Sequence, residues 1–230
     1  MKPSVKKIVI LLSVMVFLCV TAIAQNTMTI TFENGEKQKV NLVQPSCNIE
    51  SIQFNNLNGP KGNKGQEYED TKGNKVMVPC GELAFASRVV SFYEGSPKNK
   101  RPANANPDNI LGEPNYRKAS NYCITLGCEG SIVIEFTHVR LVDIDGVDLY
   151  VFEVGPAVED TKLEISKNGR TWIDIGRIKG GKTSVDIADY VSYGDQFRFV
   201  RLTDLKSACG GSTPGADIDA VAAIGCVVVN

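Results

Sequence analysis

The chain has 230 residues, 43% of them hydrophobic, which is enough for one large domain or two small ones. Its 25 basic and 26 acidic residues nearly balance, and the formal net charge is −1. Electrostatic binding to nucleic acid or to an anionic membrane needs a basic excess, so the composition excludes a nucleic-acid partner of that kind.

The first 24 residues have the pattern of a secretory signal peptide. Three lysines lie within the first seven residues, an apolar run covers 8–20, and Ala22-Ile23-Ala24 resembles a cleavage site. The run is shorter than the ~20 residues of a membrane-spanning helix. We expect cleavage after Ala24, no transmembrane segment in the mature chain, and a location in the periplasm, on the outer-membrane surface or outside the cell. The mature chain would keep 22 basic residues against 26 acids, a charge of about −4.

The next part of the chain is predicted to form a small N-terminal β unit, residues 25–57. Apolar and polar residues alternate over 27–43 around Asn34-Gly35, which is typical of a hairpin with a type I′ turn. A third strand is expected over 49–54. Residues 58–79 are rich in glycine, asparagine and lysine, and we interpret them as an exposed loop or domain boundary.

Residues 80–230 show short apolar or alternating segments and no sustained helical periodicity. A long polar loop is expected over 97–114. Strands are predicted over 83–93, 130–136, 148–154, 161–166, 171–175, 183–187, 197–203 and 216–229. Many short strands separated by turn signals predict an all-β domain, an antiparallel β-sandwich.

Seven cysteines, less Cys19 in the signal, leave six that favour disulfides in an exported chain: Cys47, Cys80, Cys123, Cys128, Cys209 and Cys226. We predict Cys123–Cys128 as a clip on one turn and Cys209–Cys226 as a tie between a loop and the last strand. Cys47–Cys80 then follows by elimination. A zinc site is the alternative, but the chain contains no C-x-x-C and only one histidine, His138.

Acidic residues surround one apolar strand, Asp143 to Glu153. Buried carboxylates are costly unless a cation neutralises them, and hard oxygen ligands beside a turn suit Ca²⁺. If the last strand lies beside this one, its two aspartates join the group. We therefore predict a structural Ca²⁺ site formed by Asp145, Asp148, Glu153, Asp217 and Asp219. The alternative is that these acids cap turns or pair with arginines.

Two sets of motifs resemble known domains. LEISKNGRTWIDIG (163–176) followed by FRFVRLTD (197–204) is similar to paired strands of galactose-binding-like jelly rolls, of the discoidin and family 32 carbohydrate-module type. A further set resembles a Bacteroidetes-type bacterial cell-surface domain that also occurs in OmpA-family proteins: ASRVVSFYEG (86–95), ILGEPN (110–115), GSIVIEF (130–136), DGVDLYVFEVG (145–155) and GADIDAVAAIG (215–225). The resemblance covers roughly residues 80 to 226. It implies a jelly-roll β-sandwich at or near the cell surface and no settled activity.

The resemblance also implies a second metal loop. In discoidin-like modules a calcium loop lies near the position of Asp108, with a C-terminal acid, here Asp219, completing it. This points to Asn106, Asp108 and Glu113, although the family's spacing is not reproduced.

Sugar binding usually needs exposed aromatic rings and polar groups near loops. Four tyrosines are candidates: Tyr93, Tyr116, Tyr122 and Tyr193. Trp172 is the only tryptophan, and its place in a predicted strand favours a core position.

These patterns favour a non-enzymatic binding or adhesion module stabilised by Ca²⁺, with a surface glycan or an envelope protein as its partner. One alternative is a glycoside hydrolase that uses two of the carboxylates. Another is a structural envelope component that binds a protein. A catalytic triad is disfavoured because His138 has no companion motif such as G-x-S-x-G.

Overall fold

The computed structural model describes residues 26–31, 37–42, 65–116, 122–155, 159–178 and 183–229. These residues belong to two compact units, one within residues 1–54 and one within 55–230. In the first unit, β1 (Asn26–Thr31) pairs with β2 (Lys37–Leu42) in antiparallel register. The pairing confirms the strands of the predicted hairpin. The Asn34-Gly35 turn, the strand expected over 49–54 and Cys47 lie outside the described residues.

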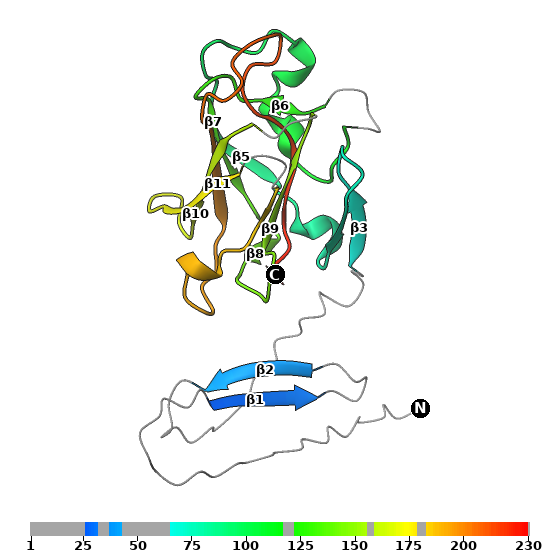
Figure 1. The fold of residues 1–230 in the computed structure, drawn as a ribbon, viewed down its shortest axis with the longest axis vertical. Helices are drawn as coiled ribbons and strands as arrows, with labels where there is room; N and C mark the ends of the chain where they lie inside the picture. The colour runs from blue at the N-terminus through cyan, green and yellow to red at the C-terminus, as the bar shows by residue number, and fades with distance from the viewer. Residues whose placement is uncertain are drawn as a thin grey trace. The chain divides into compact units, whose positions relative to one another are not determined.

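Two antiparallel sheets dominate the second unit (Figure 1). The five-stranded sheet has the order β11-β10-β13-β7-β5. Its strands are β5 (Arg88–Tyr93), β7 (Ser131–Glu135), β10 (Thr161–Ser166), β11 (Ile173–Ile178) and β13 (Phe199–Asp204). The four-stranded sheet has the order β12-β9-β14-β6. Its strands are β6 (Ile124–Thr125), β9 (Leu149–Glu153), β12 (Ser184–Val185) and β14 (Asp217–Ala223).

Smaller elements complete the unit. Two further antiparallel pairs are β3 (Gln66–Glu69) with β4 (Lys75–Val78), and β8 (Val139–Leu141) with β15 (Cys226–Val228). Short 3-10 turns are η1 (Gly81–Ala84), η2 (Pro102–Asn104), η3 (Pro107–Ile110) and η4 (Ala188–Tyr190). The described residues include no α-helix, which confirms the predicted all-β antiparallel sandwich. None of their helices is long and apolar enough to cross a membrane.

The core lies between the sheets because alternate residues of a strand point to the same side. On β7, Ile132 and Ile134 are fully buried, whereas their neighbour Val133 is only partly buried. The largest fully buried side chains are aromatic and include Phe85, Phe136 and Phe197. Burial of each such ring contributes about 2 to 3 kcal/mol, so the aromatic residues hold the two layers together.

The segment expected to be a loop, 58–79, contains the β3–β4 hairpin in its described part, so that expectation is wrong there. Asp70 holds the turn by accepting hydrogen bonds from the backbone N–H of Lys72 and of Asn74, each at 2.8 Å. The Tyr68 ring packs against Phe85 with 4.9 Å between ring centroids. Two four-residue strands beside a glycine-rich stretch give a weak sequence signal, and the hairpin is stable because it packs on the sandwich.

The disulfide pairing differs from the predicted one. Cys80 is bonded to Cys226 and Cys128 to Cys209, while Cys123 is a buried free thiol. All three predicted pairs, Cys123–Cys128, Cys209–Cys226 and Cys47–Cys80, are therefore wrong. The bonds join segments 146 and 81 residues apart in the sequence, so local spacing could not reveal them.

Trp172 does not lie in the core. Its side chain is partly buried on the outer face of the five-stranded sheet, with the Arg201 guanidinium 4.4 Å from its ring centroid. Arg201 also pairs with Glu164 on β10 at 2.6 Å. The ring therefore supports a charged pair on the sheet surface, an arrangement in which a cation over the indole face is favourable.

Candidate functional site

The five predicted calcium ligands do not meet at one point. β9 and β14 are neighbours, as expected, but their antiparallel register places Glu153 opposite Ile218 and Leu149 opposite Ala223. Glu153 and the aspartates that begin β14 therefore lie at one end of the β9–β14 strand pair. Asp148 lies at the other end. Four to five residues of strand separate the ends, about 15 Å. One ion cannot contact both groups, so the single five-carboxylate site is a wrong prediction.

At one end, Asp148 joins two backbone segments. Its side chain is fully buried and accepts hydrogen bonds from the backbone N–H of Ile144 at 2.7 Å and of Ile187 at 2.8 Å. Burial raises the pKa of Asp148 to about 6, although the two backbone hydrogen bonds oppose this. The carboxylate thus fastens the turn before β9 to the segment before η4. Asp145 is exposed in that turn.

Two further carboxylates cluster around Asp148. Oxygen atoms of Asp143, Asp148 and Asp186 lie within 4.8 Å of one another. Burial, followed by the charges of Asp186 and Asp145, raises the pKa of Asp143. Among the residues that the structure describes, this is the one group of three carboxylates close enough to share an ion. The sequence analysis missed Asp186 because it lies on another segment and carries no local motif.

At the other end, Glu153 faces Glu159. Glu153 is 4% exposed, and its Oε1 accepts a hydrogen bond from the backbone N–H of Glu159 at 3.0 Å. Burial raises the pKa of Glu153 to about 9, and the side chain of Glu159 adds to the shift through a hydrogen bond and its charge. The Glu153 carboxyl is therefore protonated at neutral pH, since its charged form would be buried beside a second carboxylate.

The aspartates at the start of β14 are anchored by nearby polar groups. Asp219, 3% exposed, accepts hydrogen bonds from the backbone N–H of Asn115 and of Tyr116, at 3.1 and 3.2 Å. Thr125 donates a hydrogen bond to Asp217. Burial raises the pKa of both aspartates to about 6. Burial and these two charges also raise the pKa of the Cys123 thiol, so that thiol is not a reactive nucleophile.

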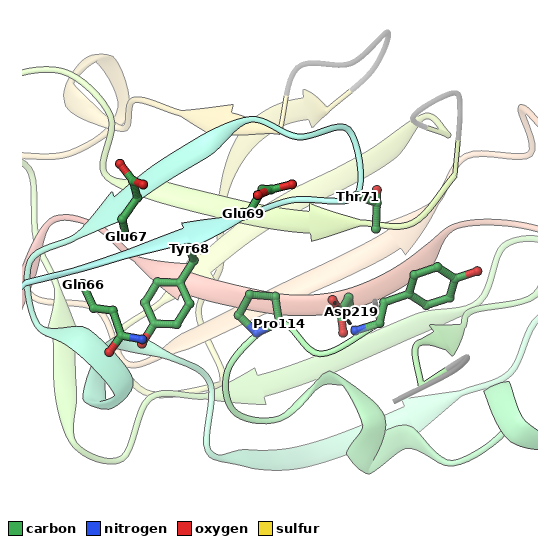
Figure 2. Close-up of a pocket in the computed structure, with 8 residues that line it drawn as sticks. Gln66, Glu67, Tyr68, Glu69, Thr71, Pro114 and Asp219 are labelled. Atoms are coloured by element: carbon green, nitrogen blue, oxygen red, sulfur yellow. Dashed lines mark hydrogen bonds between the residues drawn. The ribbon is translucent and has the colours of Figure 1, made fainter. Parts of the chain in front are cut away.

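A pocket of about 300 Å³ opens beside Asp219, between the β3–β4 hairpin, the 114–116 segment and β14 (Figure 2). Tyr116 and Tyr68 contribute aromatic rings to its lining and Gln66 contributes an amide. Tyr68 is held in place because its hydroxyl donates a hydrogen bond to Glu113. Among the described residues, three acids and neither lysine nor arginine line the pocket; the acids are Glu67, Glu69 and Asp219.

The residues of the predicted second metal loop support local structure. The Asn106 side chain accepts a hydrogen bond from the backbone N–H of Asp108 at 3.1 Å, which caps η3. Glu113 accepts a hydrogen bond from the hydroxyl of Tyr68. These polar groups therefore support a 3-10 turn and the pocket wall, and the metal loop over them stays a prediction.

The four candidate tyrosines occupy different places. Tyr116 lines the pocket. Tyr93 is 68% exposed at the end of β5, and Tyr193 is 89% exposed in the loop before β13. Tyr93 is paired with Ser131, at one end of β7. Tyr193 precedes β13, which begins opposite Glu135 at the other end of β7. Tyr122, 47% exposed, precedes β6. They do not form one aromatic surface, and only Tyr116 is combined with a cavity.

No protein-family model and no curated protein matches the chain. Among solved structures it is similar to the C-terminal domain of a chitobiase from Bacteroides fragilis, with 15% identity and a TM-score of 0.39 over 72% of this chain and all of that one. It is similar to CpGH89CBM32-6 from Clostridium perfringens, with 14% identity and a TM-score of 0.34 over 61% of this chain and 92% of that one.

A third similar structure is a glycoside hydrolase, with 15% identity and a TM-score of 0.30; the match covers 66% of this chain and 38% of that protein. Similarities at these scores assign no function to the chain. None of the three names an OmpA-type protein, so that part of the resemblance stays a prediction.

Proposed function

We propose that the sandwich is an exported, non-catalytic binding module whose pocket beside Asp219 binds part of a glycan. The observation that carries the proposal is the combination of Tyr116, Gln66 and acidic oxygens around a cavity of about 300 Å³. A sugar presents apolar C–H faces and hydroxyl donors. Aromatic rings pack on the C–H faces, and amide or carboxylate oxygens accept hydrogen bonds from the hydroxyl groups.

Two of the acids predicted from the sequence, Glu153 and Asp219, are not available as a catalytic pair, which favours binding over hydrolysis. A glycosidase needs two carboxyl groups that reach the substrate about 5 to 9.5 Å apart. Glu153 is almost completely buried, and the oxygens of Asp219 already accept backbone hydrogen bonds.

Export is supported by the two disulfides. Such bonds persist in oxidising compartments and are rare in the cytosol. The Cys80–Cys226 and Cys128–Cys209 bonds therefore favour the periplasm, the outer-membrane surface or the extracellular space.

Binding to a glycan array tests the proposal. We expect the chain from residue 25 onward to retain a discrete set of oligosaccharides, and Tyr116→Ala to weaken binding about tenfold or more, because stacking on a ring contributes on the order of 1 to 2 kcal/mol. Tyr193→Ala is the matched control, since it removes an exposed ring far from the cavity. Turnover of the same oligosaccharides would support a hydrolase, and equal losses in both variants would refute the pocket.

For calcium, we propose that the ion binds the cluster of Asp143, Asp148 and Asp186. Three carboxylates within 4.8 Å supply the hard oxygen donors that Ca²⁺ prefers, and Asp148 is already fixed by backbone hydrogen bonds.

Calcium should raise the melting temperature at pH about 8 relative to EDTA. Binding at a hundredfold excess over the dissociation constant contributes about 2.7 kcal/mol. Asp186→Asn should reduce the shift, whereas Asp189→Asn, an exposed neighbour outside the cluster, should leave it unchanged. A wild-type melting temperature that is the same in EDTA and in Ca²⁺ would contradict a calcium site.

A further inference from the structure

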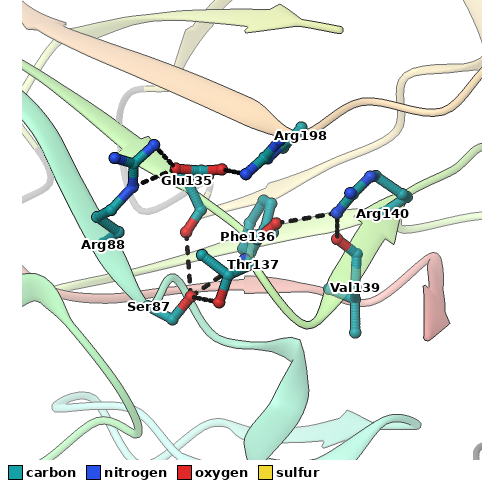
Figure 3. A network of polar contacts seen from close by, with 8 residues as sticks. All are labelled: Ser87, Arg88, Glu135, Phe136, Thr137, Val139, Arg140 and Arg198. Carbon is teal, nitrogen blue, oxygen red and sulfur yellow. Dashed lines mark hydrogen bonds and ion pairs between the residues drawn. The ribbon is translucent and has the colours of Figure 1, made fainter. Parts of the chain in front are cut away.

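A buried glutamate in the five-stranded sheet is held between two arginines. The strand register places Arg88 of β5 and Phe199 of β13 on either side of Glu135 of β7. Arg88 contacts Oε2 of Glu135 through Nε and Nη2, and Arg198 contacts Oε1 through Nη2 (Figure 3). Glu135 is fully buried, and the side chains of Arg88 and Arg198 are 57% and 41% exposed. The surface therefore presents the guanidinium groups and covers the carboxylate.

A third guanidinium lies beside this pair. Arg140 of β8 donates from Nη1 to the backbone carbonyl oxygens of Phe136 at 3.2 Å and Val139 at 2.8 Å (Figure 3). Within the described ranges it has no carboxylate partner. Arg88 and Arg198 share the one carboxylate of Glu135, and Arg140 binds the carbonyl of the next residue, Phe136. Three cations and one anion leave about two positive charges in this region of a chain whose net charge is −1. We call Arg88, Arg140 and Arg198 the arginine cluster.

The neighbouring charges do not cancel this excess. Lys167 pairs with Asp195 at 2.5 Å, so these two residues add no net charge. The Arg198 guanidinium lies 5.5 Å from the Phe199 ring centroid, and a cation over an aromatic face is favourable there. This contact and the bonds to Glu135 restrain the guanidinium, so less side-chain entropy is lost when it binds an anion.

One arginine would suffice to neutralise Glu135, and the cluster contains three. The planar guanidinium offers several N–H donors in a fork that matches carboxylate and sulfate oxygens. The pocket beside Asp219 differs in charge, because its lining, as far as the structure describes it, includes three acids and no basic residue. An anionic group would be repelled there and attracted to the arginine cluster.

We propose that the arginine cluster is a second binding site, for the carboxylate or sulfate groups of an acidic polysaccharide. The inference does not depend on glycan binding in the pocket. The three arginines of the cluster are too few for nucleic acid, whose binding relies on many phosphate contacts.

A binding titration of the chain from residue 25 onward tests this site. Its three probes are heparin, polygalacturonate and neutral dextran. At low salt we expect binding to heparin, polygalacturonate or both, and none to dextran; the two acidic probes separate sulfate from carboxylate recognition. Arg140→Ala should weaken binding about five- to tenfold, because it removes a charge-assisted donor and leaves the Glu135 contacts intact. Arg140→Lys should recover only part of the affinity, since it restores the charge without the fork.

Arg177→Ala is the charge-matched control. Arg177 is an exposed arginine on β11 that pairs with Asp160 at 3.4 Å, away from the arginine cluster. We expect its loss to change affinity less than about twofold. Equal losses in the Arg140 and Arg177 variants, no binding to either acidic probe, or equally tight binding to duplex DNA or anionic vesicles would overturn the proposal. Melting curves that coincide with wild type establish that each variant is folded.

Discussion

Raising the pH from about 5 to about 9 should destabilise the protein by roughly 3 to 6 kcal/mol. The cause is Glu153, which is 4% exposed and faces Glu159. Its pKa of about 9 in the folded protein lies above the ordinary value of 4.5. The protonated carboxyl is therefore favoured in the folded state. Its contribution is complete below the unfolded pKa and is lost as the pH rises through the folded pKa.

Glu153→Gln should remove most of this dependence above pH about 7, because the amide stays neutral and has nearly the same shape. At pH about 8 we expect the variant to be more stable than wild type by roughly 2 to 4 kcal/mol. The buried aspartates titrate near pH 6 with the same sign, so the range above pH about 7 isolates the glutamate pair.

Urea unfolding of the two proteins at several pH values measures the effect. Glu129→Gln is the control, because that glutamate is exposed and paired with Lys206; its stability should follow the wild-type curve. A wild-type stability that is constant or rises between pH about 5 and 9 would contradict a raised pKa for Glu153.

Loss of the Cys80–Cys226 bond should cost about 4 kcal/mol. The bond closes a loop with a sequence separation of 146 residues, and long loops restrict the unfolded chain most. It also fastens the segment before η1 to β15 at the end of the domain. The double variant Cys80→Ala and Cys226→Ala, compared with wild type in urea without reductant, measures the loss and avoids a stray thiol.

Peptide mapping of the oxidised protein provides the independent check on the pairing. It should recover Cys80 linked to Cys226 and Cys128 linked to Cys209. Recovery of Cys47 linked to Cys80 would contradict the structure, and an unchanged midpoint in the double variant would contradict the stabilising role of the bond.

The fold was predictable because the strands carry their own pattern. β7 alternates Ile132 and Ile134 with polar or partly exposed residues, and a strand that buries one face needs little else to be recognised. The β3–β4 hairpin was not predictable in this way. Its two strands have four residues each and are flanked by glycine, asparagine and lysine, and it is held by packing of Tyr68 on Phe85.

The site was only partly predictable, since it depends on long-range register. The predicted calcium site assumed that β9 and β14 are neighbours, which they are, but the sequence could not fix which ends coincide. That detail decides whether Asp148 meets Asp219 or lies about 15 Å away. Glu159 and Asp186 were missed for the same reason. Each reaches its partner from a separate segment, and neither belongs to a motif.

Glycan binding in the pocket beside Asp219 is the central property that we propose for this protein. The direct measurement is a titration of the isotopically labelled protein with the strongest oligosaccharide found on the array, followed by backbone amide chemical shifts. We predict that the shifts change in 66–71, in 114–116 and around Asp219, and that Tyr116→Ala abolishes these changes. Shift changes confined to other surfaces, or unaffected by Tyr116→Ala, would contradict the account.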